Sequence, residues 1–310
     1  MKYGGWFKIA FERELEDELT TVRVGERRLL CVRTPDGLRV VDAVCPHRGA
    51  DLGVNGRLDG DAVICGYHGH RIPIAPRLGG ARCPRSHPSL ARGGILFARI
   101  GEVEDGDFPG FLRALHETHH LVPGFTKSIR VAPELVIENA FDAAHFEPVH
   151  GVEDVEAEPP RVEEGVFTAR TTLFVRPTQW QGESGGSAPA SRVRVPLFAR
   201  AFSPNLTVTA IAPGGDHPHY VIAGAVPEPD GSCTIRLSLA LARRAGESEP
   251  DMEMAELLLD FESMGLEQDR PVWESLTPVE PGWVPGDATV LAYRKFCERF
   301  LLEAGGRSRP

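Results

Sequence analysis

Two short segments, each pairing a cysteine with a histidine, constrain the fold of this 310-residue chain more than any other feature. The first reads Cys45-Pro-His47-Arg-Gly-Ala and the second, after a gap of 17 residues, reads Cys65-Gly-Tyr-His68-Gly-His. Glycine and proline in these segments indicate loops rather than the interiors of helices or strands. Two thiolates and two imidazoles can bind one metal centre only if the loops meet. The pattern therefore predicts a small domain that brings both loops together at one end.

The ligand types leave more than one kind of centre open. In a Rieske centre, two histidines replace two cysteines on one iron of a [2Fe-2S] cluster. A structural zinc site can use the same Cys2His2 set. The spacing C-x-H-x17-C-x2-H differs from that of a zinc finger and favours the cluster. Four unrelated core residues are the remaining interpretation.

The residues around these loops predict a small antiparallel β domain. Between residues 21 and 44, short β-rich runs are separated by turns that contain glycine or Pro-Asp-Gly. Residues 1–100 carry an excess of Lys and Arg, whereas the rest of the chain is acidic. We therefore expect an α+β protein with two domains. Residues 1–105 would form the antiparallel β domain, and residues 106–310 would form a domain in which helices flank a curved antiparallel sheet.

A second motif lies within residues 138–150, where Asp142, His145 and His150 follow the spacing D-x2-H-x4-H. Two imidazoles and one carboxylate, with coordination positions left open, form the facial triad of non-haem Fe(II) oxygenases. This stretch could supply two of the three ligands, and the third would come from elsewhere. One regular helix would point the two imidazoles about 140° apart, so we expect Pro148 to bend it. Histidines that only pack or face solvent are the alternative.

The helix predicted over residues 251–270 offers a candidate for the third ligand. Its apolar stripe consists of Met254, Leu257, Leu258, Phe261 and Met264. Asp269 lies 11 residues beyond Leu258, about three turns, so it falls close to the buried face. An unpaired carboxylate there would be costly, and a metal ion would offset that cost. Asp260 and Glu267 are alternative ligands, and an ordinary ion pair at the helix end is the simpler interpretation.

Both motifs, in this order and at this separation, resemble the α subunit of Rieske non-haem iron oxygenases. The resemblance implies two metal centres. A [2Fe-2S] cluster would be held by Cys45, His47, Cys65 and His68, and a mononuclear Fe(II) would be held by His145, His150 and Asp269. It also implies that Asp142 links His145 to a cluster histidine of the next subunit. One departure is His70, where the family usually has tryptophan. That position is not a ligand in the family.

The resemblance also implies a function. The chain would be a terminal oxygenase that uses O2 and electrons from NAD(P)H, delivered by a reductase with or without a ferredoxin, and it would form a homotrimer. The sequence of the iron motif resembles that of the steroid-hydroxylase and sterol-desaturase branch. The segments Pro271-Val-Trp-Glu and Tyr293-Arg-Lys-Phe resemble it as well. We therefore expect monooxygenation of a hydrophobic small molecule, polycyclic molecules included. Candidate pocket residues are Phe141, Phe146, Val149 and Trp180.

Several other functions stay open within this resemblance. O-demethylation, N-demethylation and aromatic-ring cis-dihydroxylation use the same kind of iron site. A Rieske electron-transfer protein without oxygenase chemistry is a separate alternative. The pattern His116-Glu-Thr-His-His120 matches the zincin motif H-E-x-x-H, but the available helix is too short and we reject a metalloprotease.

Composition excludes further classes of function. The net charge of −10 argues against a nucleic-acid-binding protein. The chain has neither a secretory leader nor 18 uninterrupted apolar residues, so we expect a cytoplasmic protein without a membrane span. No G-x-G-x-x-G motif opens a helix, which assigns the NAD(P)H chemistry to a separate chain. In some Rieske proteins of the respiratory type, extra cysteines within the cluster loops form a disulfide. Cys83 lies outside both loops and lacks such a partner, so the resemblance implies a low-potential cluster of the oxygenase type.

Overall fold

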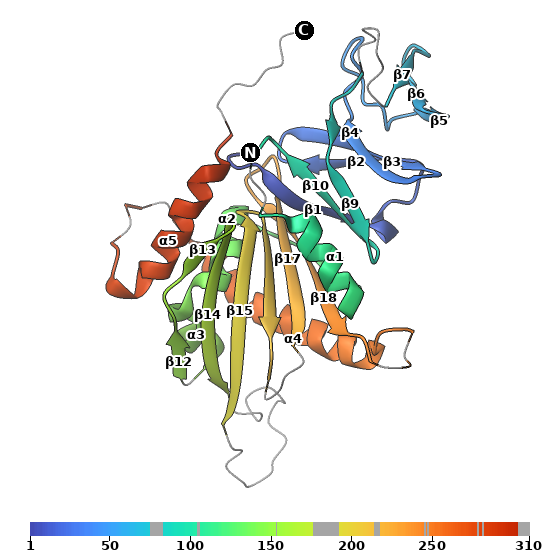
Figure 1. The fold of residues 1–310 in the computed structure, drawn as a ribbon. Helices are drawn as coiled ribbons and strands as arrows, with labels where there is room; N and C mark the ends of the chain where they lie inside the picture. Colours follow the sequence, from blue (N-terminus) through green and yellow to red (C-terminus); the bar gives the residue numbers. More distant parts are fainter. Residues whose placement is uncertain are drawn as a thin grey trace.

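The computed structural model describes residues 1–74, 83–103, 106–152, 154–175, 192–213, 218–244, 246, 248–277, 279–280 and 282–302. Small N-terminal sheets lie at one end of the molecule, and a large sheet with helices around it forms the rest (Figure 1). None of the helices in these ranges combines the length and the hydrophobicity needed to cross a membrane.

Two small antiparallel sheets build the part of the chain that carries the cysteine and histidine loops. The first has the order β2-β3-β4-β8, with β2 at Leu19–Val24, β3 at Arg27–Thr34, β4 at Gly37–Asp42 and β8 at Ser86–His87. The second consists of β5 at Arg57–Asp59, β6 at Ala62–Ile64 and β7 at Arg71–Pro73. Apolar side chains of the two sheets, such as Leu30 and Val63, pack together with both loop cysteines. The short hairpins expected from the turn residues are therefore confirmed.

A third sheet joins this part to the rest of the chain. It consists of β1 at Gly5–Phe11, β10 at Ile95–Ile100 and β9 at Ser89–Arg92. Trp6 and Phe97 of this sheet pack against Phe108 and against Phe202 of the large sheet. Lys8 is fully buried, and its side-chain amine donates to carbonyl oxygens on two strands of the large sheet, at 2.8 and 3.2 Å. These bonds are what make a buried lysine tolerable.

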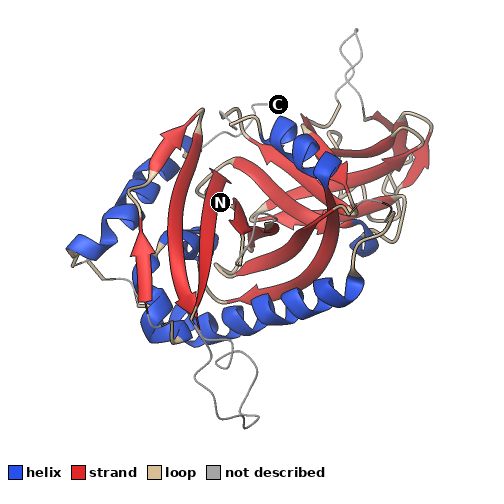
Figure 2. Ribbon diagram, turned by 60° about the horizontal axis from the view of Figure 1, so that its bottom comes forward, coloured by secondary structure: helices blue, strands red, loops and turns tan. Residues whose placement is uncertain are grey.

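The large sheet is antiparallel throughout and strongly curved (Figure 2). Its order is β11 (His119–Ile129), β18 (Cys233–Ala242), β17 (His219–Pro227), β16 (Leu206–Ile211), β15 (Val193–Ser203), β14 (Val166–Val175) and β12 (Asp154–Ala157), with β13 (Arg161–Glu163) paired to β14. Side chains alternate between its faces. Ile222 points to the face that packs on α1, whereas Val221 points to the face that packs on α4. The expected α+β fold with a curved antiparallel sheet is confirmed.

Five α-helices in the described ranges surround this sheet. They are α1 (Phe108–Thr118), α2 (Pro133–Glu138), α3 (Phe146–His150), α4 (Met252–Ser275) and α5 (Ala288–Cys297). Asp251 caps α4, because its carboxylate accepts a hydrogen bond from the Met254 N–H at 3.0 Å. In the zincin-like pattern, α1 ends at Thr118 and the two following histidines begin β11, so the pattern does not lie on one helix.

The expected apolar stripe of α4 is partly wrong. Met254, Leu257 and Met264 are exposed, and the helix instead buries Ala255, Leu266, Asp269 and Trp273. The prediction followed the most hydrophobic row of the helix. The side of the helix that faces the sheet instead includes the carboxyl group of Asp269. Hydrophobicity alone does not identify a buried side that contains a carboxyl group.

Candidate metal centres and active site

The two cysteine and histidine loops have the same backbone hydrogen bonds. The N–H groups of Cys45 and Cys65 each donate to the carbonyl five residues later, at 2.8 and 2.9 Å. The N–H groups of Gly49 and Gly69 donate back to the carbonyl of the cysteine in their own loop, both at 2.9 Å. These glycines have φ values of 75° and 69°, in the left-handed region that favours glycine. The shared turn explains why glycine is the fifth residue of each loop.

The thiols of these loops are buried and the imidazoles face outwards. Cys45 and Cys65 are 2% and 1% exposed, and each side chain is within hydrogen-bonding reach of the other. His47 and His68 are exposed, and their ring centres lie 4.8 Å apart. This separation of thiols from imidazoles suits a cluster that has two cysteines on one iron and two histidines on the other.

Backbone N–H groups point at both sulfur atoms. In each loop, the second and third residues after the cysteine provide these donors. Burial raises the pKa of Cys65, but the N–H groups and the Cys45 thiol outweigh it, so the pKa lies below its ordinary value. At Cys45 burial prevails, and the pKa is raised. Such donors stabilise thiolate ligands, and hydrogen bonds to sulfur help set the potential of an iron–sulfur cluster.

The first loop is anchored to the sheet behind it through Asp51. Its carboxylate accepts hydrogen bonds from the Arg28 guanidinium at 3.1 Å, the Thr21 hydroxyl at 2.7 Å and the Gly53 N–H at 2.9 Å. His70, the departure noted in the second loop, places its ring 4.5 Å from that of His47. The region around the two candidate ligand imidazoles, those of His47 and His68, therefore holds a third imidazole.

The iron motif is a series of short helical turns rather than one helix. α2 is followed by the 3-10 turns η2 (Asn139–Phe141) and η3 (Ala143–His145), and then by α3. The break falls at Asp142, whose φ and ψ are −92° and 95° and whose carboxylate caps the next turn at Ala144 N, 3.0 Å away. The expected bend at Pro148 is wrong. Pro148 lies in the first turn of α3, where its missing N–H has no partner to lose.

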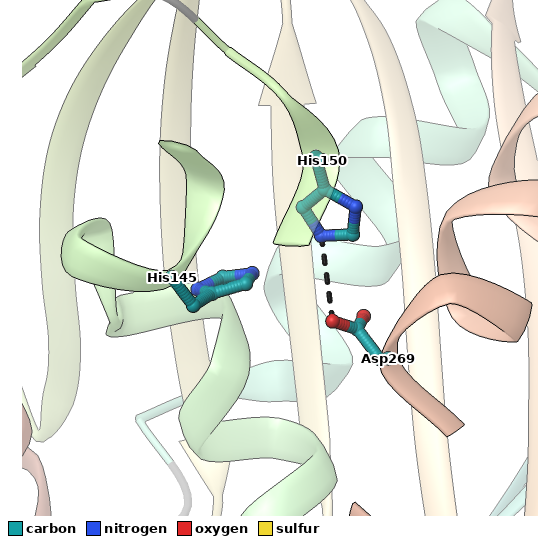
Figure 3. Close-up of side chains that lie close together, drawn as sticks. All are labelled: His145, His150 and Asp269. Atoms are coloured by element: carbon teal, nitrogen blue, oxygen red, sulfur yellow. Dashed lines mark ion pairs between the residues drawn. The ribbon is translucent and has the colours of Figure 1, made fainter. Parts of the chain in front are cut away.

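His145, His150 and Asp269 converge on one point (Figure 3). One ligand atom from each lies within 4.8 Å of the others, and His150 Nε2 is 3.4 Å from Asp269 Oδ1. Asp269 is only 7% exposed and comes from α4, more than a hundred residues along the chain from the two histidines. Two imidazoles and one carboxylate in this arrangement fit an Fe(II) facial triad.

Neighbouring groups hold the two imidazoles in the orientation that a metal requires. His145 Nδ1 contacts the backbone carbonyl of Asp142, and His150 Nδ1 lies 2.8 Å from Gln268 Oε1. With a Nδ1–H donor on each ring, the Nε2 lone pair is the one that a cation would bind. The Asn139 amide nitrogen lies 3.0 Å from Asp269 Oδ2 and 3.1 Å from His145 Nε2, so it links the two segments.

Burial disfavours charge on these groups. It lowers the pKa of His145 against the opposing effect of Asp269. It raises the pKa of Asp269 against the opposing effects of His150 and His145. Metal binding needs neutral imidazoles, and a cation would favour the ionised carboxylate. The site therefore favours neutral imidazoles, as metal binding requires, and a bound cation would stabilise the ionised carboxylate of Asp269.

The alternative ligands lie elsewhere. Glu267 pairs with Lys127 at 2.6 Å and with Arg270 at 2.7 Å, and these partners lower its pKa to about 2. Asp260 is exposed on the outer side of α4. Asp142 keeps a side chain that is 32% exposed, with Oδ2 3.9 Å from His145 Nδ1. Its carboxylate is thus accessible beside the triad.

The expected pocket residues have different surroundings. Phe141 is 2% exposed and stacks on Tyr293 in the core. Phe146 packs with the apolar side chains of β14 and β15, and Val149 is partly buried. Trp180 lies outside the described residues.

Sequence reasoning assigned no role to Asn139 or Gln268. Asn139 lies within residues 138–150 and Gln268 directly precedes Asp269, but neither position by itself indicates a role. Their roles depend on contacts across 130 and 118 residues of chain. No local pattern predicts such a pairing.

The chain is similar in sequence to known proteins. The Rieske [2Fe-2S] domain model matches residues 5–90, and the 3-ketosteroid 9alpha-hydroxylase C-terminal domain model matches residues 99–301. The oxygenase component of 3-ketosteroid-9-alpha-monooxygenase from Rhodococcus rhodochrous is 24% identical, over 96% of this chain and 81% of its own length. The vanillate O-demethylase oxygenase subunit of a Pseudomonas species is 27% identical, over 62% and 59%.

A solved structure shares the fold of this chain. The crystal structure of dicamba monooxygenase bound to 3,6 dichlorosalicylic acid superposes with a TM-score of 0.72 over 96% of both chains, at 21% identity. The family models together span most of the chain and include both sets of candidate ligands. The chain thus belongs to the Rieske non-haem iron oxygenases, as an O2-dependent oxygenase (α) subunit with a [2Fe-2S] cluster and a mononuclear iron.

Proposed function

We propose that the two metal centres have the ligands expected from the sequence, within a cluster domain of residues 1–105 and a catalytic domain of residues 106–310. The cluster ligands are Cys45, His47, Cys65 and His68, and the iron ligands are His145, His150 and Asp269. The observation that carries this proposal is the convergence of three donor atoms within 4.8 Å from two distant segments. The buried thiols and exposed imidazoles of the loops support the cluster assignment.

The residues around the iron site have separable tasks. His145, His150 and Asp269 would hold the mononuclear Fe(II), which would supply O2 activation with electrons relayed from the cluster. Gln268 and the Asp142 carbonyl orient the imidazoles through their Nδ1 atoms. Asn139 holds the Asp269 carboxylate in place. The side chain of Asp142, which is partly exposed, serves as the hydrogen-bonded link to a cluster histidine of a neighbouring subunit.

This role for Asp142 requires neighbouring subunits of the same chain, and the cluster requires an electron donor. The chain acts as a homotrimer, in which the cluster of one subunit serves the iron of the next. A separate NAD(P)H-dependent reductase, with or without a ferredoxin, recharges the cluster. The location is the cytoplasm. The relative from Rhodococcus rhodochrous, an oxygenase component, supports a system of several proteins.

The proposed reaction is monooxygenation of a hydrophobic, polycyclic small molecule. The match of residues 99–301 to the 3-ketosteroid 9alpha-hydroxylase C-terminal domain supports this class. The Phe146 ring lies 4.4 Å from the His145 ring, centre to centre, and belongs to an apolar cluster that includes Ile211, which suits such a substrate. O-demethylation is the second candidate, supported by the vanillate O-demethylase relative. The two reactions differ in product, because demethylation releases formaldehyde.

Metal and sulfide analysis of anaerobically prepared protein tests the proposal. We expect about three irons and about two acid-labile sulfides per chain. Asp269→Ala should lose about one iron and keep the sulfide, whereas Cys65→Ser should lose the sulfide. About two irons with two sulfides in the parent protein would favour an electron carrier without oxygenase chemistry. Zinc without sulfide would exclude both centres.

A further inference from the structure

The face of α4 that carries Asp269 also carries a second carboxyl group, that of Glu262. Seven residues correspond to almost two full helical turns, so both side chains leave the helix in nearly the same direction. The buried residues Ala255 and Trp273 lie along the same line. Glu262 therefore points towards the large sheet rather than to the outer surface of the helix.

The surroundings of Glu262 along this face are apolar. On one side, Leu259 packs with the apolar side chains of β17 and β18. On the other side, Leu266 belongs to the main core next to the triad. Phe146 of α3 packs in a cluster that shares Ile211 with the cluster of Leu259. The side chains about one turn before and after Glu262 on this face are thus apolar.

Glu262 has no protein partner among the described residues. None of them forms a hydrogen bond or ion pair with its carboxyl group. Burial alone raises its pKa to about 7, yet the residue keeps partial access to solvent. An unpaired carboxyl group in apolar surroundings is costly, and it is retained where it has a use. Glu267 on the same helix shows the contrast, since it pairs with two cations.

We propose that Glu262 is the polar anchor of the substrate site and accepts a hydrogen bond from a hydroxyl or amino group of an otherwise apolar substrate. This inference rests on the proposed function. Seven residues of helix rise by about 10 Å, so the anchored group lies about that far from the carbon presented to the iron ligands. The substrate class is then a rigid hydrophobic molecule, oxidised at one end and carrying a hydrogen-bond donor at the other. Glu262 determines specificity and takes no part in the oxidation.

Matched ligands on one skeleton test the proposal. The probes are 5α-androstane, 5α-androstan-3β-ol and 3β-amino-5α-androstane, delivered from cyclodextrin to anaerobic protein with both metal centres loaded. Calorimetry measures binding to the parent protein, Glu262→Leu, Glu262→Gln and the control Glu256→Leu, which changes an exposed residue of α4. Product analysis after reduction and addition of O2 gives kcat and KM.

We expect Glu262→Leu to weaken binding of the alcohol or the amine by about 10- to 100-fold, the usual effect of a hydrogen bond to a charged group. The loss of affinity should raise KM rather than lower kcat, and it should be smaller in Glu262→Gln. Binding of the hydrocarbon should not change. A preference for the amine over the alcohol would assign a cationic substrate. Equal losses for all three probes, or no loss, would overturn the role of Glu262. If the loaded parent protein neither binds nor oxidises any probe, the proposed polycyclic substrate class is wrong and the inference falls with it.

Discussion

The side-chain amide of Asn139 donates a hydrogen bond to the Asp269 carboxylate, with the two atoms 3.0 Å apart. Asn139 lies in the same chain segment as the two histidines, and Asp269 lies on α4. The contact therefore fixes the position of one candidate ligand relative to the others before any metal binds. Such contacts to the ligands of a metal usually affect its affinity.

Asn139→Ala should weaken iron binding at the mononuclear site by about 10- to 100-fold. The physical reason is that the Asp269 carboxylate loses the donor that orients it. Chelator competition followed by iron analysis measures the affinity, and the absorption spectrum of the [2Fe-2S] cluster serves as an internal control. Unchanged iron affinity would mean that α4 alone positions Asp269.

Asp142→Asn should keep both metal centres and slow electron delivery by at least about tenfold. The substitution preserves the backbone carbonyl that contacts His145 Nδ1 and removes the charge of the exposed carboxylate. Single-turnover oxidation of the reduced cluster in the presence of substrate measures the rate. Loss of iron from the variant would instead assign Asp142 to metal binding.

Gly66→Ala should disturb the second cluster loop. A Cβ at Gly66 would lie 2.5 Å from the Asn55 carbonyl oxygen, and a backbone atom cannot easily move away. We expect a lower sulfide content and a lower thermal midpoint. Gly265→Ala is the matched control, because a Cβ there meets nothing within 4 Å and alanine favours a helix by about 1 kcal/mol. A Gly66→Ala protein with full sulfide content would contradict this account.

The Glu262 carboxyl group should make the protein less stable as the pH rises from 4.5 to 7. Its pKa is about 7 in the folded protein, against an ordinary value of 4.5, so the folded state binds more protons in this range and loses stability as they dissociate. Glu262→Gln should therefore gain stability relative to the parent at pH 8 but not at pH 4, by at most about 3 kcal/mol.

Thermal midpoints at the two pH values check this effect, with Glu256→Gln as the exposed control on the same helix. An equal shift at both pH values would show that the Glu262 carboxyl group is solvated in the folded protein. That result would remove one support of the substrate anchor without bearing on the iron ligands.

The sequence alone determined the local parts of this protein. Glycine and proline predicted loops at Cys45 and Cys65, and both segments form loops that turn at a glycine in the fifth position. The hairpins follow from β-rich runs between turn residues. The closeness of Asp269 to a buried face followed from counting helical turns. Each of these predictions depends on residues near one another in the chain. The break at Asp142 is also local, although the sequence analysis expected it at Pro148, because the Asp142 side chain caps the following turn and proline is harmless in the first turn of α3.

Tertiary structure decided the rest. α4 turns a row containing Glu262 and Asp269 towards the sheet, although a neighbouring row is more hydrophobic. Asn139 reaches its partner across 130 residues. These outcomes depend on the packing of distant segments, which no local periodicity or spacing encodes.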